Sequence, residues 1–139
     1  MATVPALAEP LSDGVITLRR ISDWDIPDIL IAFQDDPEMA AGLGLARAPS
    51  GADLGSEVER SDASWEAGRP QLTLTRAGSD DCIGRLEIDL AARACQIWVS
   101  PGQRGRGYAR RALALAGDWL GAGAGCQQLQ CGQDRPRGG

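Results

Sequence analysis

Three short apolar segments separated by tight turns dominate the middle of the chain. They span residues 70–77, 82–90 and 94–101, and each is rich in the alternating or branched apolar residues typical of a strand. "GSDD" joins the first segment to the second, and "AARA" joins the second to the third. Connections this short suit antiparallel neighbours, so we expect these segments to form a three-stranded meander.

The chain before this meander is expected to supply one strand and two helices. Residues 15–21 alternate between apolar and other side chains, as in a strand, and residues 22–36 carry apolar side chains at helical spacing. The glycine-rich stretch 37–51 is expected to break regular structure. A second helix is predicted over residues 50–68, with Ser50 as its cap.

After the meander, helical spacing returns over residues 107–120. A glycine run at 121–125 is expected to end this helix, and residues 126–133 predict a final strand. Because a helical crossover normally joins parallel neighbours, this last strand is expected to lie parallel to the third meander strand. The predicted class is α/β (α+β), with a mixed, mostly antiparallel sheet flanked by helices.

The length and charge of the chain limit the number of domains and the classes of function that we expect. At 139 residues we expect one domain over residues 15–134, an N-terminal extension over 1–14 and a tail over 135–139. The net charge is −5, which argues against a general nucleic-acid binder. All the positive charge is arginine, and the absence of histidine excludes histidine catalysis and histidine metal ligands.

Four cysteines stand at positions 82, 95, 126 and 131 without a C-x-x-C pair, so a zinc site is not expected. The first residues lack the basic and apolar regions of a signal peptide, and no apolar run has the length of a membrane helix. We therefore expect a cytoplasmic protein with reduced cysteines and no membrane partner.

The stretch "SPGQRGRGYARRAL" places glycines and arginines where the predicted helix after the meander begins. Glycines at 105 and 107 allow the main chain to approach a ligand closely. N–H groups at a helix start have no partner within the helix, and the helix dipole favours an anion there. The loop therefore suits phosphate, and Arg104 and Arg106 can add charged contacts.

Other interpretations of this loop stay open on the residues alone. A P-loop requires a lysine, which the chain lacks, and "GRGYAR" lacks the last glycine of a dinucleotide-binding fingerprint. One copy of "RGRG" resembles arginine–glycine RNA-binding segments. A plain glycine-rich turn between a strand and a helix fits as well as a phosphate site.

The longer segment "CQIWVSPGQRGRGYARRAL" closely resembles the acetyl-CoA-binding segment of the GNAT N-acetyltransferase superfamily. The family pattern Gln/Arg-x-x-Gly-x-Gly/Ala is met by Arg104, Gly107 and Ala109. The segments "ITLRRISDWDIPDI", "DDPEMAAGLGL", "SWEAGR" and "CIGRLEIDL" are similar to the corresponding parts of ribosomal-protein acetyltransferases of the RimJ/RimL type. The resemblance covers residues 15–134.

The resemblance implies a role for two consecutive segments. The strand residues Ile97, Trp98 and Val99 would lie beside the pantetheine arm, and an N–H near Val99 would polarise the thioester carbonyl. The loop amides would hold the pyrophosphate of acetyl-CoA. The residues implied for that second contact are Arg104, Gly105, Arg106, Gly107, Tyr108 and Ala109.

The chain departs from the family at the positions that usually carry proton transfer. Ala94 stands where many members have a glutamate base, and Glu87 and Asp89 on the neighbouring strand are candidate substitutes or a pair of solvated carboxylates. The tyrosine that commonly protonates the leaving thiolate has no counterpart, because the sole tyrosine is Tyr108. Cys95 and Cys126 are expected to be core residues.

Related proteins continue past this chain with a further helix and strands, so the resemblance also predicts an incomplete domain. The expected function is an acetyl-CoA-dependent transfer of an acetyl group to a primary amine, either a protein N-terminus or a small amine. The alternative is a truncated, inactive acyl-CoA-binding module. A missing C-terminal part would expose a strand edge, which favours a homo-oligomer. An RNA-binding role for "RGRG" is a third hypothesis, opposed by the acidic total.

Overall fold

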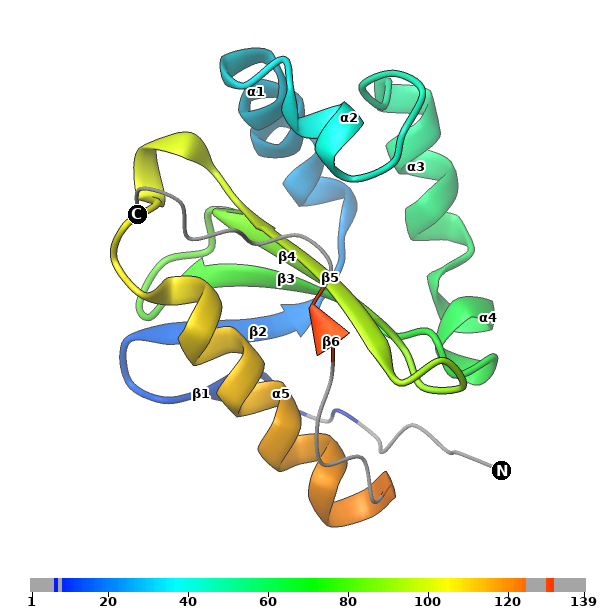
Figure 1. Ribbon diagram of the computed structural model, residues 1–139, viewed down its shortest axis with the longest axis vertical. Coiled ribbons are helices and arrows are strands. Elements are labelled where there is room, and N and C mark those ends of the chain that lie inside the picture. Colours follow the sequence, from blue (N-terminus) through cyan, green and yellow to red (C-terminus); the bar gives the residue numbers. More distant parts are fainter. Residues whose placement is uncertain (1–6, 8, 125–129, 132–139) are drawn as a thin grey trace.

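Figure 1 shows the computed structural model, which describes residues 7, 9–124 and 130–131. The elements follow the chain as β1 (Leu11–Ser12), β2 (Ile16–Arg20), η1 (Asp23–Asp25), α1 (Ile26–Asp35), α2 (Met39–Gly42), α3 (Gly51–Glu59), α4 (Ser61–Glu66), β3 (Gln71–Arg76), β4 (Gly84–Asp89), β5 (Ala94–Val99), η2 (Pro101–Gln103), α5 (Tyr108–Ala124) and β6 (Gln130–Cys131). Within these residues the strands form one sheet in the order β1-β2-β3-β4-β5-β6.

The meander predicted between residues 70 and 101 is confirmed. β3 and β4 pair antiparallel with Gln71 opposite Glu87, and β4 and β5 pair antiparallel with Glu87 opposite Gln96. The predicted parallel pairing of the last strand with β5 is also present, over two residues of β6. The predicted fold class, with its mixed and mostly antiparallel sheet, is therefore confirmed.

The short strand β1 was not predicted, because it lies in the segment 1–14 that sequence alone sets apart as an extension. Leu11 lies opposite Leu18 of β2, so this segment adds an antiparallel edge to the sheet. The tail at 135–139 and Cys126 lie outside the described residues. Among the helices of the described part of the chain, none has the length and apolar character needed to cross a bilayer.

Different helices cover the two faces of the sheet (Figure 1). Side chains alternate along β5, so Ile97 and Val99 pack in the core beneath α5 while Trp98 packs with α1, α2 and α3. Phe33 of α1 meets Trp98 edge-on, with 5.6 Å between ring centroids. The fully buried residues of α5 belong to its predicted apolar stripe: Ala112, Ala116 and Leu120.

Two segments before the meander differ from the prediction. The stretch 37–51 was expected to be irregular but contains α2, whose Met39 and Ala40 are buried in the cluster between α1 and α3. Burial of these side chains outweighs the low helix propensity of the surrounding glycines. The helix predicted over residues 50–68 begins as expected at Ser50 but divides at Arg60 into α3 and α4.

Helix α5 ends at Ala124, inside the glycine run 121–125 that was expected to end it, four residues beyond Leu120, the last residue of the predicted helical spacing. Near its C-terminal end, Trp119 packs against Trp65 of α4, with 5.6 Å between ring centroids. Leu120 is fully buried at the same level. Packing of these side chains on the sheet and on α4 therefore stabilises the helix beyond the point that local propensity predicts.

The carboxylate of Asp25 joins the start of α1 to the sheet. It is 1% exposed. Arg19 of β2 donates to it from Nη2 at 2.7 Å and from Nη1 at 3.2 Å. The hydroxyl of Thr73 on β3 donates at 2.6 Å, and the main-chain N–H of Ser22 donates at 3.0 Å. These contacts satisfy a buried charge and fix α1 over the sheet.

Replacing Asp25 with alanine should lower the free energy of unfolding by about 3–5 kcal/mol, because it leaves the Arg19 cation without its buried partner. Urea unfolding followed by tryptophan fluorescence measures this loss. The control is Asp23→Ala, which removes an exposed carboxylate from the same short helix. Equal losses of unfolding free energy in the two variants would show that the buried ion pair contributes no more to stability than an exposed carboxylate.

Candidate functional site

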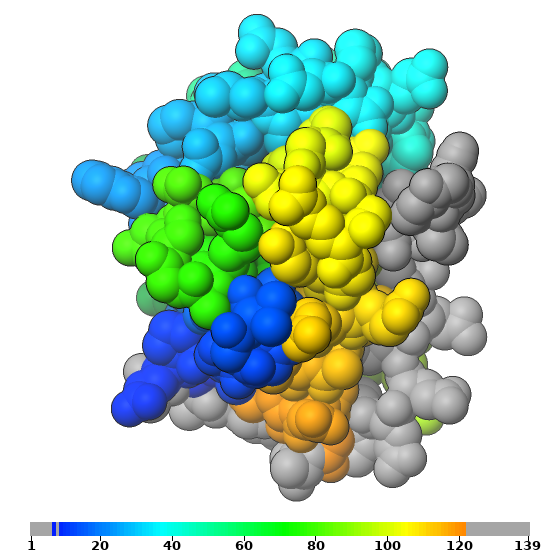
Figure 2. Space-filling model, turned by 90° about the vertical axis from the view of Figure 1, so that its left-hand side faces the viewer, coloured from blue at the N-terminus to red at the C-terminus, as the bar shows by residue number. Residues whose placement is uncertain are grey.

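A glycine-rich loop connects the end of β5 to α5. The chain leaves Val99 through η2 and then turns at Gly105 and Gly107, whose φ angles are +80° and +81°. Side chains strain the backbone at such angles, so both positions favour glycine. In Figure 2 the loop, drawn in yellow, lies at the surface between the blue and cyan α1–α2 region and the orange α5.

The main-chain N–H groups of this loop fall into two sets. Those of Gln103 and Arg104 donate to the carbonyl oxygens of Ser100 and Pro101. Those of residues 105–110 donate to no atom in the described part of the chain. These open groups stand at the N-terminal end of α5, where the helix dipole adds partial positive charge. The arrangement suits an anion such as phosphate.

The two arginines of the loop have different surroundings. Arg104 lies against its neighbouring segments, where its Nε donates to the Val99 carbonyl at 2.8 Å and its Nη1 forms an ion pair with Asp36 at 2.9 Å, although its side chain stays 43% exposed. Its Nη2 lies 3.4 Å from the sulfur of Met39. Arg106 is exposed, and within the described residues it reaches a loop carbonyl at 3.5 Å. Arg104 therefore holds the loop against α1 and α2, whereas Arg106 leaves its charge at the surface.

Near the loop, the outer edge of β5 has no strand partner among the described residues, and we call this stretch the open edge. Within the described residues β6 pairs with only the first two residues of β5, which leaves residues 96–99 without a strand partner on that side. The N–H of Ser100 donates inward to the carbonyl of Ile83, and the Val99 carbonyl accepts from Arg104 on the opposite side. Because successive peptide groups of a strand alternate in direction, the N–H of Val99 points to the open edge.

Gly84 on β4 sets how closely that strand approaches β5. A Cβ atom at this position would overlap the carbonyl oxygen of Trp98 and would lie 3.2 Å from the Cα of Val99. These are main-chain atoms that cannot move without displacing the strand. The missing side chain therefore fixes the position of the peptide group whose N–H faces the open edge.

A cleft of about 530 Å³ opens on the face of the sheet that carries α2 and α3. Arg85, Glu87 and Gln96 reach it from β4 and β5, and the side chain of Gln96 donates to the carbonyl of Leu43 at 3.1 Å. That bond holds the segment after α2 against β5. The other lining residues are Phe33, Leu45, Ala46, Arg47, Pro49, Asp53, Leu54, Ser56, Glu57, Arg60 and Trp98.

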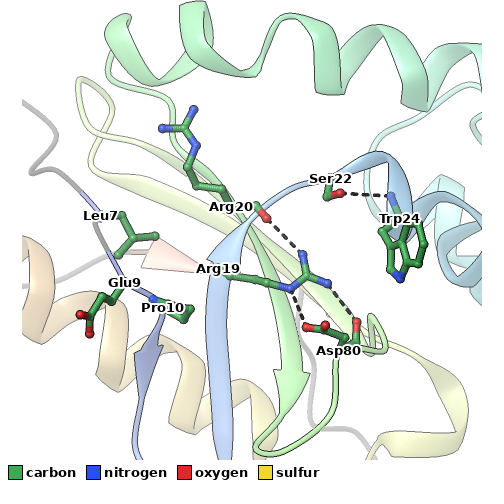
Figure 3. Close-up of a pocket in the computed structure, with 8 residues that line it drawn as sticks. All are labelled: Leu7, Glu9, Pro10, Arg19, Arg20, Ser22, Trp24 and Asp80. Carbon is green, nitrogen blue, oxygen red and sulfur yellow. Dashed lines mark hydrogen bonds and ion pairs between the residues drawn. The ribbon is translucent and has the colours of Figure 1, made fainter.

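A second hollow, of about 460 Å³, lies beside β1 and β2 (Figure 3). Arg19 points to Asp80 there, and Arg20 forms an ion pair with Asp62 at 2.7 Å and lies 4.2 Å from the ring centre of Trp65. Because both cations have partners, this hollow offers a ligand fewer free charges than the cleft. Its lining residues are Leu7, Glu9, Pro10, Arg19, Arg20, Ser22, Trp24 and Asp80.

Several solved structures are similar to this chain. Mycobacterium smegmatis RimJ in complex with CoA-disulfide matches with a TM-score of 0.64 and 23% identity, over 83% of this chain and 61% of that chain. The Salmonella typhimurium acetyl transferase that modifies the N-terminal serine of ribosomal protein L7/L12 matches with a TM-score of 0.60 and 15% identity, over 79% and 66%. The microcin C7 self-immunity acetyltransferase MccE, in complex with acetyl-CoA and AMP, matches with a TM-score of 0.61 and 16% identity, over 81% and 69%.

The fold is that of the GNAT acetyltransferases. The chain spans 61% of the length of the RimJ chain and 66% of the Salmonella chain. No protein-family model matches the sequence, and no curated protein matches it. The solved structures therefore confirm the expected resemblance at the level of the fold.

The structure separates the two carboxylates predicted as substitutes for the usual GNAT base. Glu87 lines the cleft. Asp89, two residues further along β4, is not among the cleft residues, and its side chain is 40% exposed, with an oxygen 3.9 Å from Arg69. Ala94 lies directly opposite Asp89 at the start of β5. Of this group, Glu87 alone is placed to meet a molecule in the cleft.

The sole tyrosine of this GNAT fold lies at the start of α5. Tyr108 is half-buried and packs against the core beneath that helix. The thiol of Cys82 is buried, which raises its pKa to about 12, so it behaves as an apolar core side chain. Cys95 is likewise buried. The burial of Cys95 agrees with its expected core role.

Burial raises the pKa of Glu87 above the ordinary value of 4.5. The Arg85 cation opposes this rise, the negative charge of Glu57 adds to it, and a hydrogen bond with Gln71 opposes it. Sequence reasoning missed Arg85, although its spacing of two from Glu87 on one strand was a signal that both side chains share a face. The cleft itself could not be read from the sequence, because α3 and the segment between α2 and α3 form one side of it.

Replacing Glu87 with glutamine should change how stability depends on pH. The folded-state pKa of Glu87 lies above the ordinary value of 4.5. The contribution of its protonated carboxyl to folding stability is therefore present below pH 4.5 and is lost as pH rises through the raised pKa. Glu87→Gln should therefore gain stability relative to wild type from pH 4.5 upward, measured by urea unfolding at several pH values up to about 8.

The control for this experiment is Asp89→Asn, which removes a more exposed carboxylate from the same strand. A Glu87→Gln difference that stays constant across the pH range would contradict the raised pKa.

Proposed function

We propose that the protein is an acetyl-CoA-dependent N-acetyltransferase that transfers an acetyl group to a primary amine. The observation that carries this proposal is the row of open amides at residues 105–109 beside the open edge of β5. Two structures of the same fold, RimJ and MccE, hold CoA-disulfide and acetyl-CoA, which supports a CoA ligand here. The Salmonella relative modifies an N-terminal serine, which supports a protein N-terminus as one class of acceptor.

In this proposal the loop and the strand hold different parts of acetyl-CoA. The amides of residues 105–109 bind the diphosphate, and the exposed Arg106 adds positive charge. Peptide groups at 97–99 bond the pantetheine arm along the open edge of β5. Arg104, whose amide and guanidinium both have partners within the protein, positions the loop in place of the charged contact expected from sequence. The bound molecule supplies the acetyl group as a thioester.

The main-chain N–H of Val99 and the carboxylate of Glu87 carry the chemistry in this proposal. The N–H faces the open edge, where it donates to an acyl oxygen as negative charge develops on it. Glu87 lies on the neighbouring strand and takes the proton of the attacking amine. Its raised pKa makes it a stronger base than an exposed glutamate. The protein otherwise contributes alignment of the two reactants.

A second candidate function is an acyl-CoA-binding module without turnover. It is favoured by Ala94 at the usual base position and by the location of the sole tyrosine, Tyr108, in the packed first turn of α5. A thiol-release assay with acetyl-CoA and a panel of amines separates the two candidates. Release of CoA above the Glu87→Gln background indicates catalysis, and binding without release indicates the module.

Removing one open amide should weaken acetyl-CoA binding. Proline is tolerated in the first turn of a helix, so Ala109→Pro deletes an N–H at the second position of α5 with little effect on the fold. Loss of a hydrogen bond to a charged phosphate should raise the Kd about tenfold or more, measured by isothermal titration calorimetry.

The matched control is Ala109→Ser, which changes the side chain but keeps the amide and should bind close to wild type. Circular dichroism checks that both variants fold. Wild-type protein that gives no heat and no thermal shift with millimolar acetyl-CoA would overturn the proposed function.

A further inference from the structure

Arg85 is a buried cation beneath the cleft, and most of its donors are open. The residue is 5% exposed. Its Nη1 donates to Glu57 of α3 at 2.9 Å, whereas its Nε and Nη2 have no hydrogen-bond partner among the described residues. A guanidinium carries five N–H donors and no acceptor, and buried donors without partners are costly. The site therefore lacks an acceptor that an incoming molecule can supply.

The carboxylates around the cleft do not satisfy Arg85. Asp53 accepts instead from Arg47 and from the amide of Ser50 at the start of α3. Glu87 lies two residues away on β4 and feels the charge of Arg85, but in the described part of the chain the two share no hydrogen bond. Within the ranges that the structure describes, one ion pair, with the partly exposed Glu57, holds the guanidinium in place.

We propose that Arg85 binds an oxyanion, a carboxylate or a phosphate, carried by the acceptor itself. The acceptor is then a small primary amine with an anionic group a few bonds from its nitrogen. This inference rests on the proposed function and names its substrate class. Because the open donors lie just below the cleft surface, the guanidinium turns toward the cleft on binding, which its single ion pair permits.

The spacing of Arg85 and Glu87 fits the two ends of one small molecule. Side chains two residues apart on a strand project from the same face, about 7 Å apart at their origins. An oxyanion on Arg85 therefore leaves the amine nitrogen of the same molecule near Glu87. A planar guanidinium with two adjacent open N–H donors also matches the paired oxygens of a carboxylate or phosphate.

Four related amines test the proposal by calorimetric binding to the full chain in the presence of CoA. L-serine carries a carboxylate, phosphoethanolamine carries a phosphate, and L-serinamide and ethanolamine carry neither. Wild-type protein should bind one or both anionic amines at least tenfold tighter than the neutral pair, and the preferred member identifies the anion. Arg85→Gln should remove that preference. Equal binding of all four, or a preference that survives in Arg85→Gln, would overturn the proposal.

The matched control for charge is Arg76→Gln, which removes an exposed arginine at the end of β3 and should keep the preference. A second variant keeps the test valid if Arg85→Gln does not fold. Glu57→Gln keeps an oxygen that can accept from Nη1 but removes the negative charge that competes for Arg85, so it should bind the anionic amines more tightly than wild type. Unchanged or weaker binding in Glu57→Gln would count against Arg85 as the anion receptor.

Acetyl-CoA titrations on the same preparations separate this inference from the proposed function. Acetyl-CoA should bind wild type and Arg85→Gln with similar affinity, because the loop lies apart from Arg85. If acetyl-CoA binds both but the amines show no preference for an anion, only the acceptor class is wrong. If acetyl-CoA does not bind wild type, the proposed function fails, whatever the amines do.

Discussion

The buried contact between Asp25 and Arg19 is the interaction on which the arrangement of this protein depends. It is made where the chain leaves β2 and enters α1, and Thr73 extends it to β3. Because the Asp25 carboxylate is buried, losing its hydrogen-bond donors would cost much free energy. These contacts therefore fix the direction in which α1 leaves the sheet. Helices α2 and α3 pack on α1, and α3 forms one side of the cleft together with the segment between α2 and α3.

The open strand edge, the glycine-rich loop and the start of α5 meet at the end of β5, and main-chain geometry places them there. Gly84 allows β4 to approach closely, and the bond from Ser100 to Ile83 ends the pairing of the two strands. Beyond this point the chain turns into the loop with its open amides. Strand edge, loop and helix start are therefore consecutive in sequence, which explains why a short segment carries so much of the recognisable pattern.

Sequence alone predicted the parts of the structure that depend on local order. The meander follows from alternation and short turns, and the loop follows from Gly105 and Gly107 at a helix start. The cleft, the role of Asp25 and the contacts of Arg104 depend on segments that are distant in sequence. Such contacts cannot be predicted from local patterns in one sequence. For Arg85, the sequence predicted its position on a strand but not its burial under α3.

Arg104 has one further consequence. Its single side chain touches the strand end at Val99, the last turn of the α1 region at Asp36 and the first residue of α2 at Met39. A shorter or uncharged residue at 104 would therefore lose contacts with three segments at once. The side chain thereby couples the shape of the loop to the packing of α1 and α2, so the ligand-facing amides and the helices beyond them respond to the same residue.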